Sequence, residues 1–129
     1  MLPIHTAIVV DDDRDVNLLL AAILKLKKFD VYKVFSAEEC LDKLKELEAK
    51  VDVICVNGKI AADRAAMLIV KIKRINPDIK ICALAEDETH KTRVLDYGAD
   101  EFITKPIGIE TIVDKIMILL TRKYSKAER

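Results

Sequence analysis

The sequence predicts an α/β protein with a doubly wound, five-stranded parallel sheet and helices on both faces. Short apolar runs without clean polar alternation recur five times, which is typical of strands buried on both faces. Stretches with apolar residues at helical spacing separate these runs, so strands and helices alternate along the chain. Five consecutive strand–helix units favour a parallel sheet, because right-handed crossovers place a helix on a sheet face after each strand.

The expected strands are the five short apolar runs. Their ranges are Thr6–Val10, Val31–Phe35, Val51–Val56, Ile79–Leu84 and Glu101–Thr104. The first run leads directly into three consecutive carboxylates. Cys55 and Cys82 fall inside two of the runs, where a thiol behaves as a small hydrophobic side chain.

The expected helices fill the intervals between the strands. Their ranges are about Arg14–Lys28, Ser36–Leu47, Ala62–Ile75, Asp87–Tyr97 and Ile109–Lys123. The second helix begins at a capping box, in which Ser36 caps the helix and Glu39 reaches back. The fourth helix ends at Gly98, the position where a left-handed residue commonly closes a helix.

Apolar residues at helical spacing indicate which side of each helix faces the sheet. In the first helix these are Val16, Leu19, Leu20, Ile23 and Leu26. In the third they are Leu68, Ile69, Ile72 and Ile75, and in the fifth Ile109, Ile112, Val113, Ile116, Met117 and Leu120. Ile118 and Leu119 fall off this last stripe, and exposed apolar residues of this kind can mark a partner surface.

Length and composition indicate one domain and exclude several functional classes. The 129 residues are 51% hydrophobic and carry 22 basic and 22 acidic side chains. The zero net charge gives no basic field for nucleic acid. No apolar run approaches the roughly 20 residues of a membrane span, and the amino terminus lacks a signal-peptide pattern. We place the domain at residues 1–122, with a polar, fraying tail at 123–129.

Cysteines and histidines show no metal or catalytic spacing. The three cysteines are far apart, which fits a reduced cytoplasmic protein and excludes a zinc motif. His5 and His90 have no partners at ligand or triad spacing. We therefore expect both histidines to be exposed and non-catalytic.

Asp11, Asp12 and Asp13 follow the first strand without a break. Three adjacent carboxylates repel one another, so they need a cation, a helix to cap, or solvation. In open α/β sheets, ligands bind beyond the carboxyl ends of the strands. We expect Asp11 and Asp12 to belong to such a site, and Asp13 to cap the first helix or lie at its rim.

Four motifs, in order and on the expected elements, resemble the receiver domain of two-component response regulators over essentially the whole chain. They are Val9-Val10-Asp11-Asp12-Asp13, Asp52-Val53-Ile54-Cys55-Val56, Gly98-Ala99-Asp100-Glu101-Phe102 and Lys105-Pro106. The resemblance implies a flavodoxin-like sheet of order 2-1-3-4-5. It also implies that a histidine kinase donates a phosphoryl group to an aspartate at the end of the third strand, beside a bound Mg²⁺.

The residues of this sequence match only part of the receiver site. Lys105 matches the lysine that pairs with the phosphate, and Phe102 the aromatic switch position. The phosphoacceptor position holds Asn57, whose carboxamide has no anionic oxygen to attack phosphorus. The position of the Ser/Thr hydroxyl holds Ala85, which has no donor. The chain therefore resembles a degenerate receiver, or pseudo-receiver, with no catalytic residue.

The resemblance implies a weakened metal site. Its ligands are Asp11, Asp12 and Asn57, together with the backbone carbonyl of Lys59. The loss of one negative charge lowers affinity for a hard cation, so we expect no required cofactor and at most weak Mg²⁺ binding. Without added Mg²⁺, we expect the site to be either empty or filled by the ammonium of Lys105 or Lys59 between the two aspartates.

The favoured function is non-enzymatic signalling by protein–protein contact in a two-component or phosphorelay setting. A protein partner or a second copy is expected at the face of the fourth helix, fifth strand and fifth helix, through Phe102, Ile118 and Leu119.

Two alternatives stay open. A phosphorylatable receiver would use a non-standard aspartate, Asp12 or Asp13, or Asn57 after deamidation in its Asn57-Gly58 pair. A flavodoxin-like module could instead bind a small molecule in the altered pocket, since fold alone does not fix function.

Overall fold

Five parallel strands form a single sheet in the order β2-β1-β3-β4-β5, which confirms the predicted topology. The computed structural model describes residues 5–11, 14–57, 62–104 and 108–127. The strands are β1 His5–Val10, β2 Phe29–Val34, β3 Val53–Asn57, β4 Lys80–Ala85 and β5 Glu101–Thr104. The helices are α1 Arg14–Leu26, α2 Ala37–Glu46, α3 Ala62–Ile75, α4 Lys91–Asp96 and α5 Ile109–Ala127.

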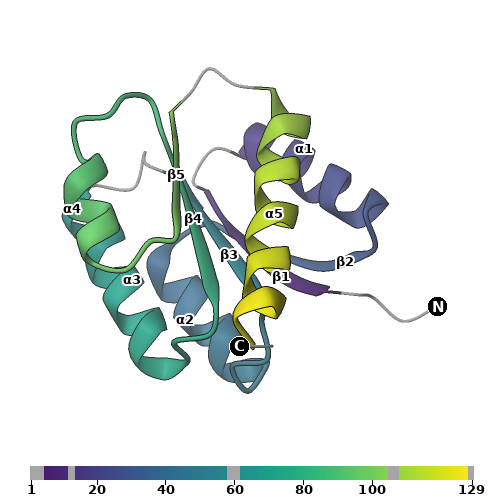
Figure 1. Ribbon diagram of the computed structural model, residues 1–129, viewed down its shortest axis with the longest axis horizontal. Helices are drawn as coiled ribbons and strands as arrows, with labels where there is room; N and C mark the ends of the chain where they lie inside the picture. The colour runs from purple at the N-terminus through teal and green to yellow at the C-terminus, as the bar shows by residue number, and fades with distance from the viewer. Residues whose placement is uncertain (1–4, 12–13, 58–61, 105–107, 128–129) are drawn as a thin grey trace.

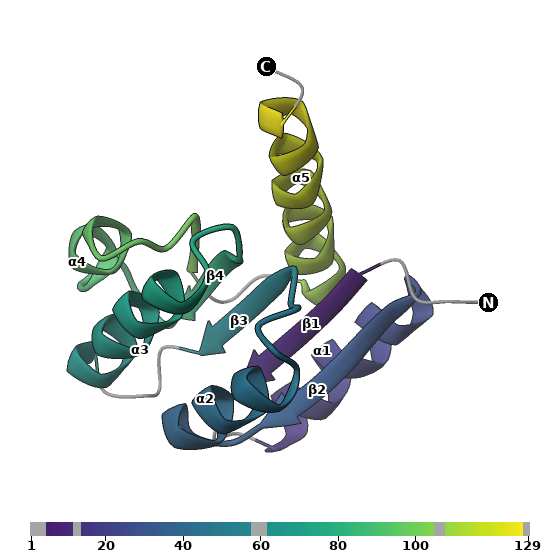
Figure 2. The same cartoon turned by 90° about the horizontal axis from the view of Figure 1, so that it is seen from below.

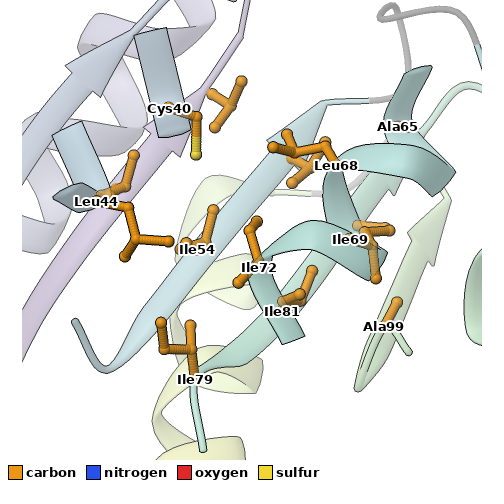
Figure 3. Close-up of a cluster of buried hydrophobic side chains, with 14 of the residues drawn as sticks. Cys40, Leu44, Ile54, Ala65, Leu68, Ile69, Ile72, Ile79, Ile81 and Ala99 are labelled. Atoms are coloured by element: carbon orange, nitrogen blue, oxygen red, sulfur yellow. The ribbon is translucent and has the colours of Figure 1, made fainter. Parts of the chain in front are cut away.

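The helices cover both faces of the sheet (Figures 1 and 2). Helices α1 and α5 lie on one face, and α2, α3 and α4 on the other. Each central strand supplies both layers, because Ile8 and Val10 join the cluster under α2–α4 while Ala7 and Val9 join the cluster under α1 and α5. The first of these clusters is drawn in Figure 3. Burial on both faces explains why the strands show no polar alternation.

The predicted amino end of α2 and the predicted carboxyl end of α4 are confirmed. The Ser36 hydroxyl accepts a hydrogen bond from the Glu39 amide at 3.1 Å. The Glu39 carboxylate reaches back to the Phe35 amide at 2.9 Å, one residue before the cap. Gly98 follows α4 with a φ of +123°, and a Cβ there would lie 3.2 Å from Lys73 Cγ. Glycine is needed here for both reasons.

Helix α4 is shorter than predicted, and α5 is longer. The predicted amino-terminal residues of α4 form bends and a turn, in which the Asp87 carboxylate accepts from the Thr89 amide at 2.9 Å. Such a local bond competes with helical hydrogen bonding, so the helix starts only at Lys91. Helix α5 continues to Ala127, past the predicted end at Lys123.

The inward faces of the helices are only partly as predicted. In α1, Leu20 and Leu24 are buried, whereas Leu19 and Leu26 were predicted inward and are exposed. In α3, Ile75 is likewise exposed. Helix α1 carries leucines on several faces, so spacing alone leaves its core side ambiguous.

Leu119 was predicted to be exposed, and this was wrong. Its side chain is 3% exposed, whereas that of Ile118 is 51% exposed, as predicted. Helix α5 packs against α1 as well as the sheet, so it buries a wider arc than one core contact requires. Leu119 therefore belongs to the core and not to a partner surface.

All three cysteines are buried and free, and their thiols are expected to be unreactive in the folded protein. Burial raises the pKa of the Cys40 thiol to about 12. Cys55 and Cys82 lie opposite each other on β3 and β4, and the contact with Cys55, followed by burial, raises the pKa of the Cys82 thiol.

An aromatic disulfide reagent at pH 8 should therefore label the native protein at least about 100-fold more slowly than the denatured protein, because the thiolate is the reactive form. The absorbance of the released thiol measures the rate. Denaturant should release all three thiols, and rapid stoichiometric labelling without it would contradict the assigned burial.

Candidate functional site

The candidate site lies at the carboxyl edge of the sheet, between β1 and β3. Asp11 directly follows β1, and Asn57 is the last residue of β3. Val10 pairs with Val56 in the register of these two strands, so the residues that follow each of them are neighbours. The chain leaves β1 toward β2 on one side and β3 toward β4 on the other, which makes this the topological switch point.

Asp11 and Asn57 form a buried, directly hydrogen-bonded pair. Each residue is 1% exposed, and Asn57 Nδ2 donates to Asp11 Oδ2. An ionised carboxylate can only accept, so the carboxamide must supply the N–H. The Asp11 amide also donates to the Val34 carbonyl at 3.1 Å, which holds its backbone against β2. The hydrogen bond from the Asn57 carboxamide thus offsets part of the free-energy cost of burying the Asp11 carboxylate.

Ala85 and Phe102 lie on β4 and β5. Ala85 pairs with Thr104 at the carboxyl ends of these strands, and its methyl group offers no hydrogen-bond donor. Phe102 is half-buried and packs against the cluster under α2–α4. Thr104 lies beside Ala85 at this edge of the sheet, and none of the sequence motifs includes it.

Several predicted site residues lie outside the described residues. These are Asp12, Asp13, Lys59 and Lys105. Their predicted roles as metal ligand, helix cap, carbonyl ligand and substituting ammonium therefore stay predictions. Within the described ranges, no group of three or more His, Cys, Asp and Glu side chains forms a metal cluster.

His5 is buried, which corrects the expectation that it is exposed. Its ring packs against Phe29 with a centroid distance of 5.3 Å, because β1 begins one residue earlier than predicted and pairs these two positions. Its Nδ1 lies 3.9 Å from the Asp52 carboxylate, which accepts from the Thr6 amide at 2.8 Å. These contacts lie at the amino end of the strands, opposite the candidate site. His90 is exposed, as predicted.

A second polar cluster, which sequence reasoning missed, fixes the turn before β5. Asp100 Oδ2 accepts from Lys73 Nζ and from the Ile81 amide, both at 2.8 Å. Lys73 Nζ also donates to the Ile79 carbonyl at 2.7 Å. This cluster ties α3 to β4 and to the loop that leads into Phe102. The Gly98–Phe102 motif contains Asp100, but nothing in the sequence pairs it with Lys73.

The comparisons with known proteins agree with this geometry. The family model of the response regulator receiver domain matches residues 7–117. The chain belongs to this receiver family. Two curated relatives are the transcriptional regulatory proteins PrrA of Mycobacterium bovis and Mycobacterium tuberculosis, each 28% identical over 122 residues. The alignments cover 93% of this chain and 52% of the relatives, so the receiver spans about half of their length.

Solved receiver structures share the fold. A CheY-like receiver domain from Methanospirillum hungatei is 22% identical, with a TM-score of 0.83, and 98% of this chain and 99% of that chain align. The BeF3-activated DrrB receiver domain is 23% identical, with a TM-score of 0.73 over 100% of both chains. NtrX from Brucella abortus, solved in complex with ATP, is 20% identical with a TM-score of 0.84, and 28% of its chain aligns with 99% of this one.

Receiver domains bind Mg²⁺ at their phosphorylation site, and of the predicted side-chain ligands only Asp11 and Asn57 lie among the described residues. Mg²⁺ requires several oxygen ligands in near-octahedral geometry. Here Asp11 Oδ2 accepts an amide N–H from Asn57, so a cation bound at that oxygen would compete with this donor.

Among the described residues, none of the helices combines the length and the hydropathy of a membrane span.

Proposed function

We propose that this receiver domain signals by protein–protein contact and is not switched by aspartyl phosphorylation at the usual position. The observation that supports this proposal is the Asn57–Asp11 pair at the carboxyl ends of β1 and β3. Phosphoryl transfer needs a carboxylate oxygen that attacks phosphorus. Asn57 has a neutral amide there, and its N–H group is directed at Asp11. A hydrogen bond between a carboxamide and a carboxylate therefore stabilises this position, where two carboxylates would otherwise bind a cation.

Any Mg²⁺ binding through Asp11, Asp12, Asn57 and the Lys59 carbonyl is proposed to be weak. Removing one carboxylate lowers the negative charge on which affinity for such ions depends. The hydrogen bond between Asn57 and Asp11 adds a competitor that is part of the fold. Titration calorimetry should therefore show no tight Mg²⁺ binding, and a tight one-to-one isotherm would contradict the proposal.

The proposed partner surface is the face formed by α4, β5 and α5. Figure 1 shows β5 between these two helices. Ile118 on α5, and Leu95 and Tyr97 at the end of α4, are exposed apolar side chains, and Phe102 on β5 is half-buried. Receiver domains interact with histidine kinases or effector domains. We propose that a protein of the two-component system contacts Phe102 and Ile118. Leu119 is not part of this surface, because it is buried.

The decisive experiment is incubation with acetyl phosphate and Mg²⁺, followed by intact-mass measurement. We expect no mass gain of a phosphoryl group, because the acceptor position lacks a nucleophilic carboxylate. An adduct that peptide mapping places on Asp12 or Asp13 would instead support phosphorylation at a non-standard aspartate.

Deamidation of Asn57 needs a separate control. A freshly purified sample and an aged one should be compared by peptide spectra. An adduct that appears only in aged protein, on a converted Asn57 peptide, would favour the deamidation alternative.

A further inference from the structure

Helices α2 and α3 lie side by side on the same face of the sheet (Figure 2). Their side chains line a groove between them. The groove has two adjoining hollows, of about 640 Å³ toward the carboxyl ends of the helices and about 320 Å³ toward their amino ends. Leu41 of α2 and Lys71 of α3 line both hollows. Met67 and Ile75, which are 56% and 52% exposed, add apolar surface along α3. Contiguous exposed apolar surface of this kind marks contact sites on proteins.

The two rims of this groove carry opposite charges. The rim on the α2 side has the exposed acids Glu38, Asp42 and Glu48, interrupted by Lys45. The rim on the α3 side has the exposed bases Arg64, Lys71 and Arg74. A purely acidic helix would be repelled by the α2 rim, and a purely basic one by the α3 rim. The best match is therefore a surface with an acidic rim beside a basic one.

Each hollow of the groove holds acids from the α2 side and bases from the α3 side, and the larger hollow also holds the like-charged Lys45 and Arg74. Both helices run back against parallel strands, so α2 and α3 point in the same direction. Glu38 and Arg64 share the smaller hollow, while Asp42 and Lys71 share the larger one. A two-fold axis parallel to the helices would place the α2 rim of one copy against the α3 rim of another at the same level. Asp42 of each copy would then face Lys71 of the other.

We propose that the α2–α3 face binds a second copy of this chain in a two-fold symmetric dimer. Isologous contacts of this type use the same self-complementary patch on both subunits. The acid–base pairs of the rims would each occur twice, around a centre formed by Leu41, Met67 and Ile75. The dimer leaves Ile118 exposed, because α5 lies on the other face of the sheet. It does not depend on phosphorylation or on the partner proposed for α4–β5–α5.

The size of the face predicts a weak, concentration-dependent dimer. Helices of 10 and 14 residues are about 15 and 21 Å long at 1.5 Å per residue. With helix axes about 10 Å apart, the footprint is below the roughly 800 Å² per partner of standard stable interfaces. We therefore expect a Kd on the order of 10–500 μM.

Sedimentation velocity of the full chain, from about 5 μM to about 1 mM, tests the proposal. The weight-average mass should rise toward that of a dimer at low salt. The apparent Kd should increase at 0.5 M salt, where the Debye length shortens to about 4 Å. A protein that stays monomeric throughout this range at low salt would overturn the proposal.

Charge reversal identifies the face. Asp42→Lys and Lys71→Glu should each weaken self-association by about 10-fold or more, because each creates two repulsive contacts in the symmetric dimer. An equimolar mixture of the two variants should associate as well as the wild type, since Asp42→Lys and Lys71→Glu are complementary across the axis. Lys25→Glu, an equal reversal on exposed α1 at the opposite face, is the matched control and should leave the Kd unchanged.

A loss of association counts only for variants that keep the wild-type fold. Circular dichroism should show that the three variants keep the wild-type fold. If dimers form but the mixture does not restore association, the dimer uses another face and the proposal is wrong. The same conclusion follows if Lys25→Glu weakens association as much as the groove variants do.

Discussion

The variant Asn57→Asp is expected to be less stable than the wild type by about 2–4 kcal/mol at neutral pH without Mg²⁺. The substitution replaces an N–H group that donates to Asp11 with a second carboxylate at the same buried position. The hydrogen bond between the two residues is lost, and two adjacent buried carboxylates repel each other. Urea unfolding with and without Mg²⁺ measures the difference.

The loss should depend on pH in a defined direction. The neighbouring negative charge and burial raise the pKa of the introduced carboxyl above its unfolded value. The native variant then binds more protons than the unfolded chain, so its stability falls as pH rises. The difference from the wild type should therefore shrink toward acidic pH, and it should grow as pH rises through the folded pKa.

Mg²⁺ should restore much of this loss in the variant and do little for the wild type. A ligand that binds only the folded state at 100 times its Kd adds about 2.7 kcal/mol of stability. The variant also regains the nucleophile, so acetyl phosphate with Mg²⁺ should give it a phosphoryl adduct that the wild type lacks. Ala85 still has no hydroxyl to contact that group, and the adduct need not produce a switched state.

The matched control exchanges the two side chains, as Asp11→Asn together with Asn57→Asp. This double variant keeps one carboxylate and one carboxamide, so the buried hydrogen bond can form in the reverse sense. It should recover most of the stability without gaining a response to Mg²⁺. If the single variant is as stable as the wild type in metal-free buffer, the Asn57–Asp11 hydrogen bond does not stabilise the fold as proposed.

The alternation of strands and helices was predictable, because the same two hydrophobic patterns recur along the whole chain. Apolar runs such as Ile79–Leu84 are buried on both faces, and the right-handed crossover rule then gives a parallel sheet with helices on both faces. The strand order 2-1-3-4-5 was implied by the resemblance to receiver domains. The predicted start of α2 at Ser36 and the predicted end of α4 at Gly98 were confirmed, because caps depend on local chemistry. The start of α4 was not predictable, because it depends on a bond from Thr89 to Asp87 that competes with the helix.

The composition of the candidate site was predictable, but its internal contacts were not. The strand order implied by the receiver resemblance makes Asp11 and Asn57 neighbours at the ends of adjacent strands. It does not show that they bond directly to each other, because that depends on side-chain conformations and on burial. The prediction that His5 is exposed was wrong for the same reason, since its burial depends on Phe29 of the adjacent strand. Contacts between elements that are distant in sequence are what the pattern leaves open.

The largest stability effect outside the site is expected at Ile72, where Ile72→Ala should cost about 2–5 kcal/mol. Ile72 is fully buried between α3 and the sheet, among Leu68, Ile54 and Ile81 (Figure 3). Truncation removes buried methyl groups and leaves a cavity that a close-packed core fills only in part. Against a typical total stability of about 5–15 kcal/mol, this loss is large.

Ile75→Ala is the matched control for this prediction. It makes the same chemical change on the same helix, three residues away, at a side chain that is 52% exposed. Its effect on unfolding should stay within about 0.5 kcal/mol, since exposed substitutions away from special features are nearly neutral. Urea unfolding at a few micromolar protein keeps both variants monomeric, so the α2–α3 face does not contribute. Equal losses for the two variants would mean that Ile75 shares the core with Ile72, as the helical spacing alone suggests, and that the assigned face of α3 is wrong.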